Sequence, residues 1–433
     1  MVSDFFYPNV GGVESHIFYL SQELMALGHK VIVITHNYGT RSGVRYLKNG
    51  LKVYYLPEIV MFEQATFPSL YISFPLLRNI LMREQIDIVH AHQGFSPLSH
   101  ITVIHCKTMG ISCCFTDHSL YRFADLTSIL SNKILKYMLS DVDKVICVSN
   151  TSKENTVLRA VLNPQNVFVI PNAVVAKNFT PDFSRRDPKH ITIIVLSRLV
   201  YRKGIDLLIA IIPKICQKYP SVKFRIAGDG QKKGELEQMR EQHLLHDRVE
   251  FIGEVKQSQV REVLVTGHIF LNTSLTEAFC MAIVEAACCG LLVVSTRVGG
   301  VPEVLPKHMM ILAKPVQSEV FAALSQAIEL FQLQQINTDT FHEEVSEMYS
   351  WKDVARRTEI VYNSNTVGQN PPLIERLRRY YGCGFLAGKL LCLVFLLDYL
   401  WLQFLEIIFP ESQIQIAPDF PSIEYREHRK KNK

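Results

Sequence analysis

The chain has 433 residues, 48% of them hydrophobic and 20% charged, which allows two domains with separate cores and excludes extensive disorder. The formal net charge is +5, but residues 426–433 hold five basic side chains and one acid, so this tail alone carries +4. The rest is nearly neutral, which argues against a nucleic-acid binder, because such proteins carry a basic face on the folded body.

The ten cysteines include no C-x-x-C pair, and most lie in apolar runs such as residues 145–148. This pattern indicates buried, reduced thiols in a domain that faces the cytosol, in preference to disulfides or a zinc site.

The chain begins with a predicted short strand, Met1–Phe6, and a glycine-rich loop that ends in Gly11 and Gly12. Apolar residues at helical spacing then predict a helix up to Gly28, followed by a buried strand at Val31–Thr35. Strand, loop, helix and strand form a βαβ unit. Paired glycines before a helix let the backbone approach a ligand closely, although a simple turn uses the same residues.

Further strands are expected at residues 51–55, 86–90, 113–116 and 144–149, which completes an N-terminal domain over residues 1–165. His118 directly follows one of these strands, and a second polar cluster, residues 90–93, follows another. Open α/β sheets bind ligands at the carboxyl ends of their strands, so His118 is a candidate site residue. A satisfied core or surface histidine is the alternative interpretation.

Residues 166–188 are rich in proline and turn formers and are expected to link the domains. A second βα series over residues 189–345 begins with the strand 191–196 and a helix over 205–218, and continues with strands at 223–227, 249–252, 269–272 and 291–295. Arg198 and Lys203–Gly204 follow its first strand, and Gly228 and Gly230 follow its second. Two cations there are suited to neutralise a departing nucleoside diphosphate, whereas a solvated basic loop is the alternative.

Two carboxylates, Glu277 and Glu285, stand eight positions apart after the strand 269–272. At a helical rise of 1.5 Å per residue they lie about 12 Å apart, close to the distance from sugar to ribose in a nucleotide sugar. A helix that starts near Phe279 would direct its free N–H groups at a diphosphate between them. Two unrelated acids on an amphipathic helix are the alternative.

A helix within residues 346–365 is expected to cross back to the first domain, and residues 366–381 are expected to be a linker. Residues 382–409 are long enough to span a bilayer, at about 20 residues per span. They also hold Lys389, Asp398 and Glu406, so a single span and an interfacial or re-entrant helix both stay open. In a span, Asp398 would pair with a polar residue of a partner subunit.

Residues 410–433 form a basic tail. Positive residues flank both ends of the apolar segment, so the positive-inside rule leaves its orientation undecided. The last four residues also resemble a dilysine retrieval signal, which is read from the cytosol and is incompatible with a single span from a cytosolic domain.

Gly11–Gly12, Arg198 with Lys203–Gly204, Gly228–Gly230, and Glu277 with Glu285 together resemble the motifs of family-four GT-B glycosyltransferases, which retain the configuration of a nucleotide sugar. The resemblance covers about residues 1–365. It implies an α/β fold of the GT-B type, with two Rossmann-like doubly wound domains facing a cleft, to which a C-terminal hydrophobic helix is added. Cys280 departs from the family's usual glycine.

Longer stretches, residues 1–16, 115–119, 152–159, 197–207 and 267–285, resemble more narrowly the catalytic subunits of phosphatidylinositol N-acetylglucosaminyltransferase. This family begins glycosylphosphatidylinositol (GPI) anchor synthesis on the cytosolic face of the endoplasmic reticulum. The resemblance implies retaining transfer of N-acetylglucosamine from UDP-GlcNAc to phosphatidylinositol, without a metal or other cofactor. It also implies a membrane protein that works with other subunits and not with nucleic acid.

The resemblance assigns the leaving diphosphate to Arg198 and Lys203, the donor sugar to Glu277 and the ribose hydroxyls to Glu285. His118 would line the sugar pocket near the reacting centre. The other donor-binding positions would be Gly11, Gly12, Gly228, Gly230, Ala278, Phe279 and Cys280. Two alternatives remain: a lipid-directed transferase for another nucleotide sugar, such as a mannosyltransferase, and a non-catalytic scaffold protein within a complex.

Overall fold

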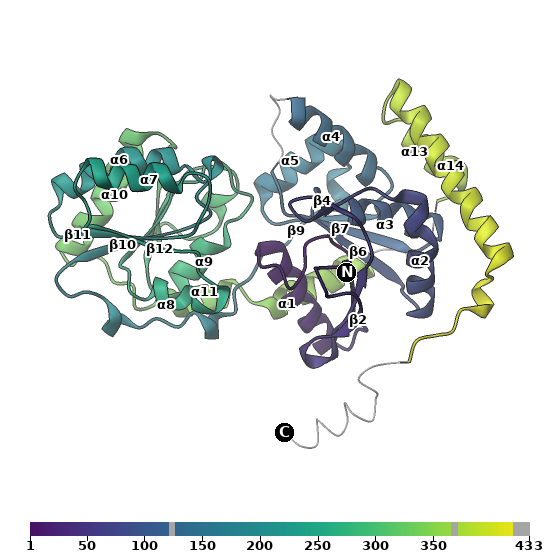
Figure 1. The fold of residues 1–433 in the computed structure, drawn as a ribbon, viewed down its shortest axis with the longest axis horizontal. Helices are drawn as coiled ribbons and strands as arrows, with labels where there is room; N and C mark the ends of the chain where they lie inside the picture. Colours follow the sequence, from purple (N-terminus) through teal and green to yellow (C-terminus); the bar gives the residue numbers. More distant parts are fainter. Residues whose placement is uncertain (121–125, 365–370, 419–433) are drawn as a thin grey trace, which may run out of the picture. The chain divides into compact units, whose positions relative to one another are not determined.

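The structure, a computed structural model, describes residues 1–120, 126–364 and 371–418. The chain forms two α/β units, each with its own sheet (Figure 1). The first unit contains Met1–Val148, Ser152–Ile170 and the chain from Val354 onward, and the second contains Ser149–Thr151 and Pro171–Asp353. The strands of both main sheets pair in parallel apart from β2 with β3 in the first unit, as expected when helices connect the strands.

In the first unit Val2 joins two groups of strands, in the orders β1-β3-β2 and β6-β7-β8-β9. The expected first strand is reduced to this residue, which bridges Ile34 and Ala91, while its amide donates to the His90 carbonyl at 2.9 Å. The strands are β1 (Ile32–His36), β2 (Gly43–Tyr46), β3 (Lys52–Leu56), β6 (Ile88–His92), β7 (Ser112–Asp117), β8 (Lys144–Cys147) and β9 (Val167–Val169), with a separate hairpin of β4 (Val60–Phe62) and β5 (Ala65–Thr66).

Helices pack on both faces of this sheet. Ile17 of α1 packs on Val33 and Val53 on one face, whereas Leu77 of α2 and Ile101 of α3 belong to the core of the other face. The helices are α1 (Gly12–Ala26), α2 (Leu70–Arg83), α3 (Pro97–Thr108), α4 (Leu126–Leu139), α5 (Asn150–Ala160), most of α12 (Trp351–Asn363), α13 (Leu373–Tyr381) and α14 (Phe385–Ile408).

The second unit is a six-stranded parallel sheet in the order β12-β11-β10-β13-β14-β15. Its strands are β10 (Ile191–Leu196), β11 (Val222–Ala227), β12 (Val249–Gly253), β13 (Ile269–Asn272), β14 (Leu292–Thr296) and β15 (Met310–Ala313). Helices α6 (Ile205–Lys218), α7 (Lys233–Gln242) and α10 (Gln317–Gln332) cover one face, and α8 (Val260–Leu264), α9 (Met281–Cys288) and α11 (Phe341–Met348) the other (Figure 1).

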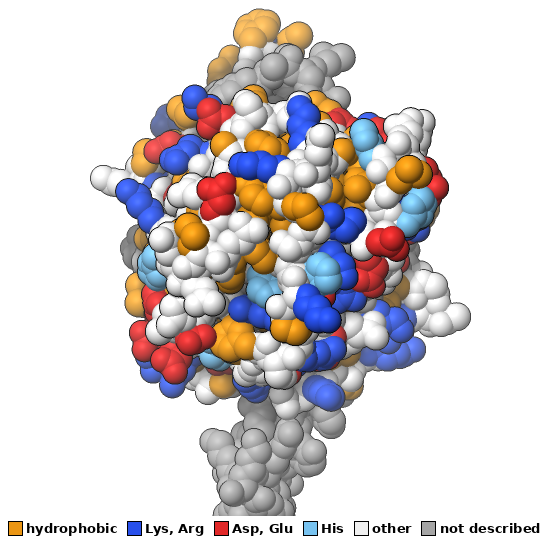
Figure 2. Space-filling view, turned by 90° about the vertical axis from the view of Figure 1, so that its left-hand side faces the viewer, with side chains coloured by type: hydrophobic (Ala, Val, Ile, Leu, Met, Phe, Trp, Pro, Cys, Tyr) orange, Lys and Arg blue, Asp and Glu red, His pale blue; other side chains and the backbone are white. Residues whose placement is uncertain are grey.

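The central strands β10, β13 and β14 are mainly apolar because both faces of a parallel sheet are covered, whereas β11 and the edge strand β12 also carry charged residues. Ile193, Val195 and Leu271 are buried in its core, together with the apolar stripe of α6. On the face drawn in Figure 2, acidic and basic side chains are interspersed, and apolar side chains lie among them.

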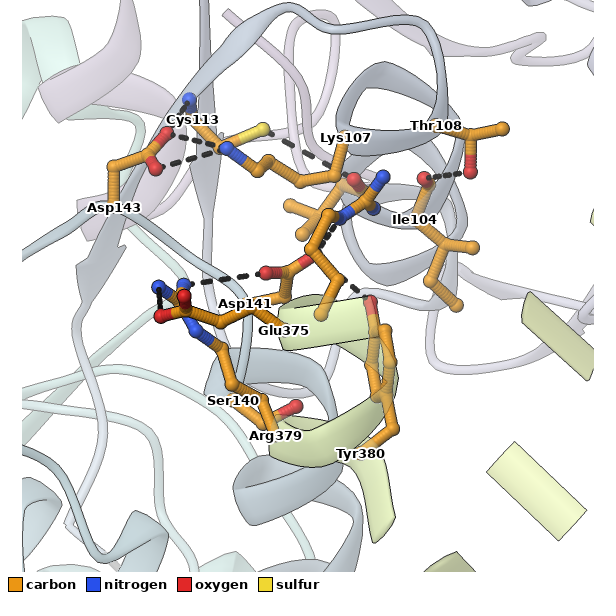
Figure 3. Close-up of polar contacts among 12 residues, drawn as sticks. Ile104, Lys107, Thr108, Cys113, Ser140, Asp141, Asp143, Glu375, Arg379 and Tyr380 are labelled. Atoms are coloured by element: carbon orange, nitrogen blue, oxygen red, sulfur yellow. Dashed lines mark hydrogen bonds and ion pairs between the residues drawn. The ribbon is translucent and has the colours of Figure 1, made fainter. Parts of the chain in front are cut away.

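Two stretches expected as linkers contain regular structure. Within residues 166–188, β9 pairs with β8 in the sheet of the first unit. Within residues 366–381, the described part forms α13, whose Arg376 and Tyr380 are buried. The polar sequence of α13 favoured a linker over a helix. In the fold, Arg376 and Arg379 of this helix pair with Asp141 (Figure 3).

Helix α14 is the one helix of the described ranges that is long and apolar enough to cross a bilayer. Asp398 is fully buried and pairs with His105 and Thr108 of α3. The expectation that Asp398 pairs with another subunit is therefore wrong for this fold, since α3 supplies both partners from within the chain.

Candidate functional site

Most of the residues expected to bind the donor lie at one edge of the sheet of the second unit, whereas Gly11, Gly12 and His118 belong to the first unit. β10 has β11 on one side and β13 on the other, so the strand order reverses between β10 and β13. Ligands of open α/β sheets bind outside the carboxyl ends of the strands at such a switch point. Arg198 and Lys203 follow β10, and Glu277 follows β13, so the topology brings these distant segments to the same edge.

Lys203 and Glu277 form an ion pair across this switch point. Ser274 donates a hydrogen bond to the same carboxylate oxygen of Glu277 at 2.7 Å, and Thr273 donates to the Lys203 carbonyl at 2.9 Å. Burial would lower the pKa of the Lys203 amine, but the Glu277 carboxylate outweighs it and the pKa is raised. Lys203 is therefore a fixed cation, held in place before any ligand arrives.

Arg198 is exposed, and its positive charge lowers the pKa of Lys203. This effect indicates that the two cations lie close together. Its guanidinium has no ion pair among the residues that the structure describes. An exposed guanidinium beside a fixed ammonium offers two cationic donors at the end of β10, which suits a diphosphate.

Three glycines let the loops of this edge approach one another. Gly204 has a φ of +68°, and a Cβ there would lie 1.8 Å from the Thr273 carbonyl oxygen. A Cβ at Gly228 would lie 1.9 Å from the carbonyl oxygen of Ser197, and one at Gly230 would lie 2.5 Å from that of Leu199. No other residue type fits these positions without moving the backbone.

Helix α9 begins at Met281, two residues later than expected, because Cys280 occupies the left-handed region with a φ of +75°. Glycine adopts this conformation without strain, which explains why the related motif usually has glycine here. Ala278 and Phe279 are buried in the turn before the helix, and the Ala278 carbonyl accepts from the Ser149 hydroxyl at 2.8 Å.

Glu285 is buried inside α9. Burial raises the pKa of its carboxyl to about 7, and the Gln257 side chain, which donates to it at 3.0 Å, limits the rise. A carboxyl with this pKa accepts hydroxyl hydrogen bonds well once it has lost its proton.

In the first unit His118 lies in a cluster of histidines. It follows β7, His92 ends β6, and His16 lies in the second turn of α1. The ligand nitrogens of these three side chains lie within 4.8 Å of one another. Burial and the neighbouring imidazoles hold the pKa values of His92 and His118 well below their usual range, so both rings are neutral at pH 7.

The glycine loop borders this cluster at the start of α1. Gly11 precedes the helix, and a Cβ there would meet the Glu14 carboxylate at 2.4 Å. Asn9 donates to the same carboxylate at 3.1 Å. Nothing lies within 4 Å of the position that a Cβ on Gly12 would take. The end of the Glu14 side chain can move aside, so packing does not by itself require glycine at Gly11, and the space beside Gly12 is open.

Several residues of these edges were not predicted from the sequence. Gly300 donates its N–H to the Glu277 carbonyl at 3.0 Å, and Ser274 and Gln257 hold the two carboxylates. They lie in loops with no motif of their own. His16 lies one helical turn beyond Gly12, so helical periodicity alone would have indicated it.

Two family models match the chain. One is described as PIGA (GPI anchor biosynthesis) and matches residues 36–125. The other is described as glycosyl transferases group 1 and matches residues 177–336.

Curated relatives match over almost the whole chain. A phosphatidylinositol N-acetylglucosaminyltransferase gpi3 subunit of Schizosaccharomyces pombe is 58% identical over 97% of this chain and 92% of its own length. The corresponding subunit of this transferase in Arabidopsis thaliana is 57% identical, over 97% and 93%. The human counterpart is 55% identical, over 97% and 87%.

Solved structures match the fold at low identity. Sucrose-phosphate synthase of Thermosynechococcus elongatus gives a TM-score of 0.69 at 19% identity, over 82% of this chain and 94% of its own. HepE of Anabaena, in complex with UDP and glucose, gives 0.66 at 17% identity, over 83% and 98%. The fold is therefore that of the GT-B glycosyltransferases.

Proposed function

This chain belongs to the family of GPI3-type subunits of phosphatidylinositol N-acetylglucosaminyltransferase, and we propose that it is the subunit that transfers N-acetylglucosamine from UDP-GlcNAc to phosphatidylinositol with retention. It is a glycosyltransferase of GPI-anchor biosynthesis with a GT-B fold. The proposal adds the donor, the stereochemistry, the acceptor and the residue roles. It includes partner subunits, because its relatives are named as subunits.

The observation that carries the proposal is the Lys203–Glu277 pair with Arg198 beside it at the β10/β13 switch point. In the proposed reaction the bond between the sugar C1 and the diphosphate oxygen breaks. Arg198 and Lys203 stabilise the negative charge that develops on the leaving UDP. Glu277, oriented by Lys203 and Ser274, holds the donor sugar, and ionised Glu285 accepts from the ribose hydroxyls.

The new bond forms between C1 and the inositol 6-hydroxyl on the face that the diphosphate leaves. The hydroxyl proton passes to an oxygen of the leaving diphosphate, so no side chain acts as nucleophile. His118, neutral because of its burial, is assigned to the sugar near the reacting centre. The N–H groups after Gly11 and Gly12 are assigned to the phosphates and the acceptor.

The experiment is a donor panel in membranes that contain the chain and its partner subunits. Labelled UDP-GlcNAc is expected to transfer sugar to phosphatidylinositol, with no transfer from GDP-mannose, and NMR of the product is expected to show the donor's anomeric configuration. Transfer from GDP-mannose alone would instead identify a mannosyltransferase. A rate unchanged by chelator is the expected result for a metal-independent reaction, and loss of the rate on chelation would contradict it.

The scaffold alternative is tested by Glu285→Lys, which places a cation where the ribose is proposed to bind. Loss of transfer with the complex still assembled is expected. Full transfer by this variant would assign the chemistry to another subunit. Localisation at the endoplasmic reticulum with both units in the cytosol is part of the same proposal, and cell fractionation with protease protection tests it.

A further inference from the structure

Three histidines from separate segments of the first unit direct ring nitrogens at one another. His16 lies in the second turn of α1, His92 ends β6, and His118 directly follows β7. One nitrogen of each ring lies within 4.8 Å of a nitrogen of the other two. Within residues 1–120, 126–364 and 371–418, no other group of three or more histidine, cysteine or acidic side chains meets this spacing.

The register of the sheet brings two of these rings together. β6 and β7 pair in parallel, with His92 opposite Thr116. Side chains two positions apart along a strand return to the same face, so His118 follows Thr116 on the side of His92. The two rings stack with their centroids 5.7 Å apart, and His92 Nδ1 lies 3.4 Å from His118 Nε2.

Helix α1 places the third ring over this pair. The His16 centroid lies 4.6 Å from that of His118 and 5.5 Å from that of His92. The next residue, Ile17, is fully buried in the core with Val33 and Val53. The position of His16 is therefore fixed by the packing of its own helix.

A fourth histidine supports the cluster without offering a ligand atom. The His90 ring lies 4.1 Å from that of His92 between centroids. Its Nδ1 is 2.6 Å from the Tyr362 hydroxyl, and its Nε2 is 2.6 Å from the Thr116 hydroxyl. Both of its nitrogens are thus engaged, and the ring backs His92 from one side.

The spacing of the ligand nitrogens suits a tetrahedral ion. With metal–nitrogen bonds of about 2.0–2.1 Å, two nitrogens of a tetrahedral site lie about 3.3 Å apart. His92 Nδ1 and His118 Nε2 are already at 3.4 Å, beyond the usual range of about 2.7–3.2 Å for a hydrogen bond donated by N–H. The third nitrogen is at most 4.8 Å away, so closing the site requires a shift of no more than about 1.5 Å.

The donor set selects the kind of ion. Three imidazoles with a fourth position left open form a known type of zinc site. Mg²⁺ and Ca²⁺ prefer oxygen ligands, and this cluster contains no carboxylate. The neutral imidazole is the form that binds a metal, and the rings of His92 and His118 are neutral at pH 7.

The cluster has one open side. His16 and His92 are buried, whereas His118 is partly exposed. An ion therefore enters past His118, and water takes the remaining coordination position.

We propose that His16, His92 and His118 bind one Zn²⁺ ion, and that the bound ion inhibits sugar transfer by occupying the His118 ring. The inhibition rests on the proposed function, which assigns this ring to the donor sugar, whereas the zinc site does not. Zinc and the donor then exclude each other. The reaction itself needs no metal, so the chain works with the site empty.

Cobalt spectroscopy on the purified full chain in detergent tests the site. Tetrahedral Co²⁺ absorbs strongly in the visible range, whereas hydrated octahedral Co²⁺ absorbs weakly. The metal-stripped chain is expected to develop the tetrahedral spectrum with one equivalent of Co²⁺ and to lose it when one equivalent of Zn²⁺ is added. A near-ultraviolet charge-transfer band would instead reveal a thiolate ligand, place the ion at a cysteine and overturn the proposal.

Substitution of one ligand links the spectrum to the cluster. His16→Gln is expected to weaken Zn²⁺ binding at least tenfold, since loss even of a group that only supports a ligand costs about 10–100-fold. His308→Gln, which removes an exposed imidazole of the second unit, is the matched control and is expected to bind zinc as the unaltered chain does. Circular dichroism checks the fold of each variant, and His118→Gln replaces His16→Gln if the latter does not fold.

Two results of the binding experiment would overturn the proposal. One is the absence of a tetrahedral spectrum in the unaltered chain. The other is unchanged zinc affinity in a folded variant that lacks one of the three imidazoles.

Transfer assays in membranes with the partner subunits test the inhibition. Added Zn²⁺ is expected to raise the apparent KM for UDP-GlcNAc, and a chelator is expected to restore it, whereas Mg²⁺ at the same concentration has no effect. In His16→Gln the zinc concentration for half-inhibition, relative to the variant's own zinc-free rate, is expected to rise at least tenfold.

The two proposals fail in different ways. Zinc binding without any effect on an active enzyme would overturn the inhibition and leave the proposed function in place. Absence of transfer from UDP-GlcNAc in zinc-free membranes would overturn the proposed function, and the inhibition with it, while the cobalt spectrum would still decide whether the zinc site exists.

Discussion

Arg198 and Lys203 carry the same charge in different surroundings, and this difference separates their effects. Lys203 is mostly buried and pairs with Glu277, whereas Arg198 is exposed at the end of β10. Arg198→Ala is expected to lower the transfer rate by more than tenfold without changing the Tm, because one electrostatic donor is worth about a hundredfold to a thousandfold in rate.

Lys203→Ala is expected to lower both the rate and the Tm, since it leaves the largely buried Glu277 carboxylate without its cation. Lys218→Ala, which removes an exposed ammonium of α6, is the control. Transfer assays and thermal unfolding of all three variants check the pair. Near-normal turnover of both site variants would remove them from the mechanism.

Glu285 makes stability depend on pH in a predictable direction. Its pKa is about 7 in the folded chain, against 4.5 as the ordinary value. Between these two values the folded state keeps a proton that the unfolded state releases, so stability falls as pH rises through this window. Glu285→Gln, which stays neutral, is expected to gain Tm relative to the unaltered chain from pH 5 to pH 8.

Thermal unfolding at intervals of pH measures this difference, with Glu319→Gln on the exposed side of α10 as control. A Tm difference for Glu285→Gln that is constant across the window would show that the carboxyl is ionised throughout. The same titration predicts weaker UDP binding below pH 7, because the protonated carboxyl is a poorer acceptor for the ribose hydroxyls.

Cys280 holds a conformation that suits glycine. Its φ of +75° costs a residue with a Cβ about 1–2 kcal/mol. Cys280→Gly is therefore expected to stabilise the chain by about 1 kcal/mol, after allowance for the greater freedom of glycine in the unfolded state. Ala287→Gly within α9 is expected to have the opposite sign. Denaturant unfolding compares the two, and a destabilising Cys280→Gly would show that the thiol contributes packing that outweighs the strain.

Among the elements, the βα series was predictable because its apolar runs and helical stripes are long. The predicted strand 191–196, the helix 205–218 and the strand 269–272 have the bounds of β10, α6 and β13. The exposed strands β2 and β4 gave no such signal, since their side chains face solvent, and β5 is only two residues long. α13 was not predicted because its Arg376 is charged and yet buried in the fold, where it pairs with Asp141. A charged residue in a sequence normally indicates an exposed position.

The glycines of the loops differ in what they must accommodate. A Cβ at Gly204 would overlap the Thr273 carbonyl, and the φ there is positive, whereas the space around Gly12 is open. Gly204→Ala is expected to destabilise the second unit by several kcal/mol, since the backbone that follows β13 must move. Gly12→Ala is expected to fold normally. Circular dichroism during thermal unfolding separates them, and an unchanged Tm for Gly204→Ala would mean that this loop is not packed as described.

At the scale of the whole molecule, each unit contains one tryptophan. Trp351 belongs to the second unit, and Trp401 lies on α14 in the first. In Trp401→Phe the remaining tryptophan fluorescence reports on the second unit, and in Trp351→Phe it reports on α14. UDP at 100 times its Kd is expected to add about 2.7 kcal/mol to the unit that binds it.

We therefore expect UDP to raise the denaturant midpoint measured by the fluorescence of Trp351 and to leave the midpoint measured by that of Trp401 unchanged. The comparison uses denaturant unfolding of the two single-tryptophan chains, with CMP as the control ligand. A shift confined to Trp401 would place the nucleotide in the first unit and contradict the assignment of Arg198, Lys203 and Glu285.

The sequence by itself determined the local structure and the family, because hydrophobic periodicity, glycine positions and long matching runs are properties of neighbouring residues. It placed Arg198, Lys203, Glu277 and Glu285 after the correct strands. The tertiary structure decided what those residues touch: that Lys203 pairs with Glu277, that Glu285 is buried enough to shift its pKa, and that His16 and His92 join His118. It also decided that Asp398 has its partners on α3. Contacts between residues tens or hundreds of positions apart depend on the order of strands in a sheet, and a single sequence does not contain that order.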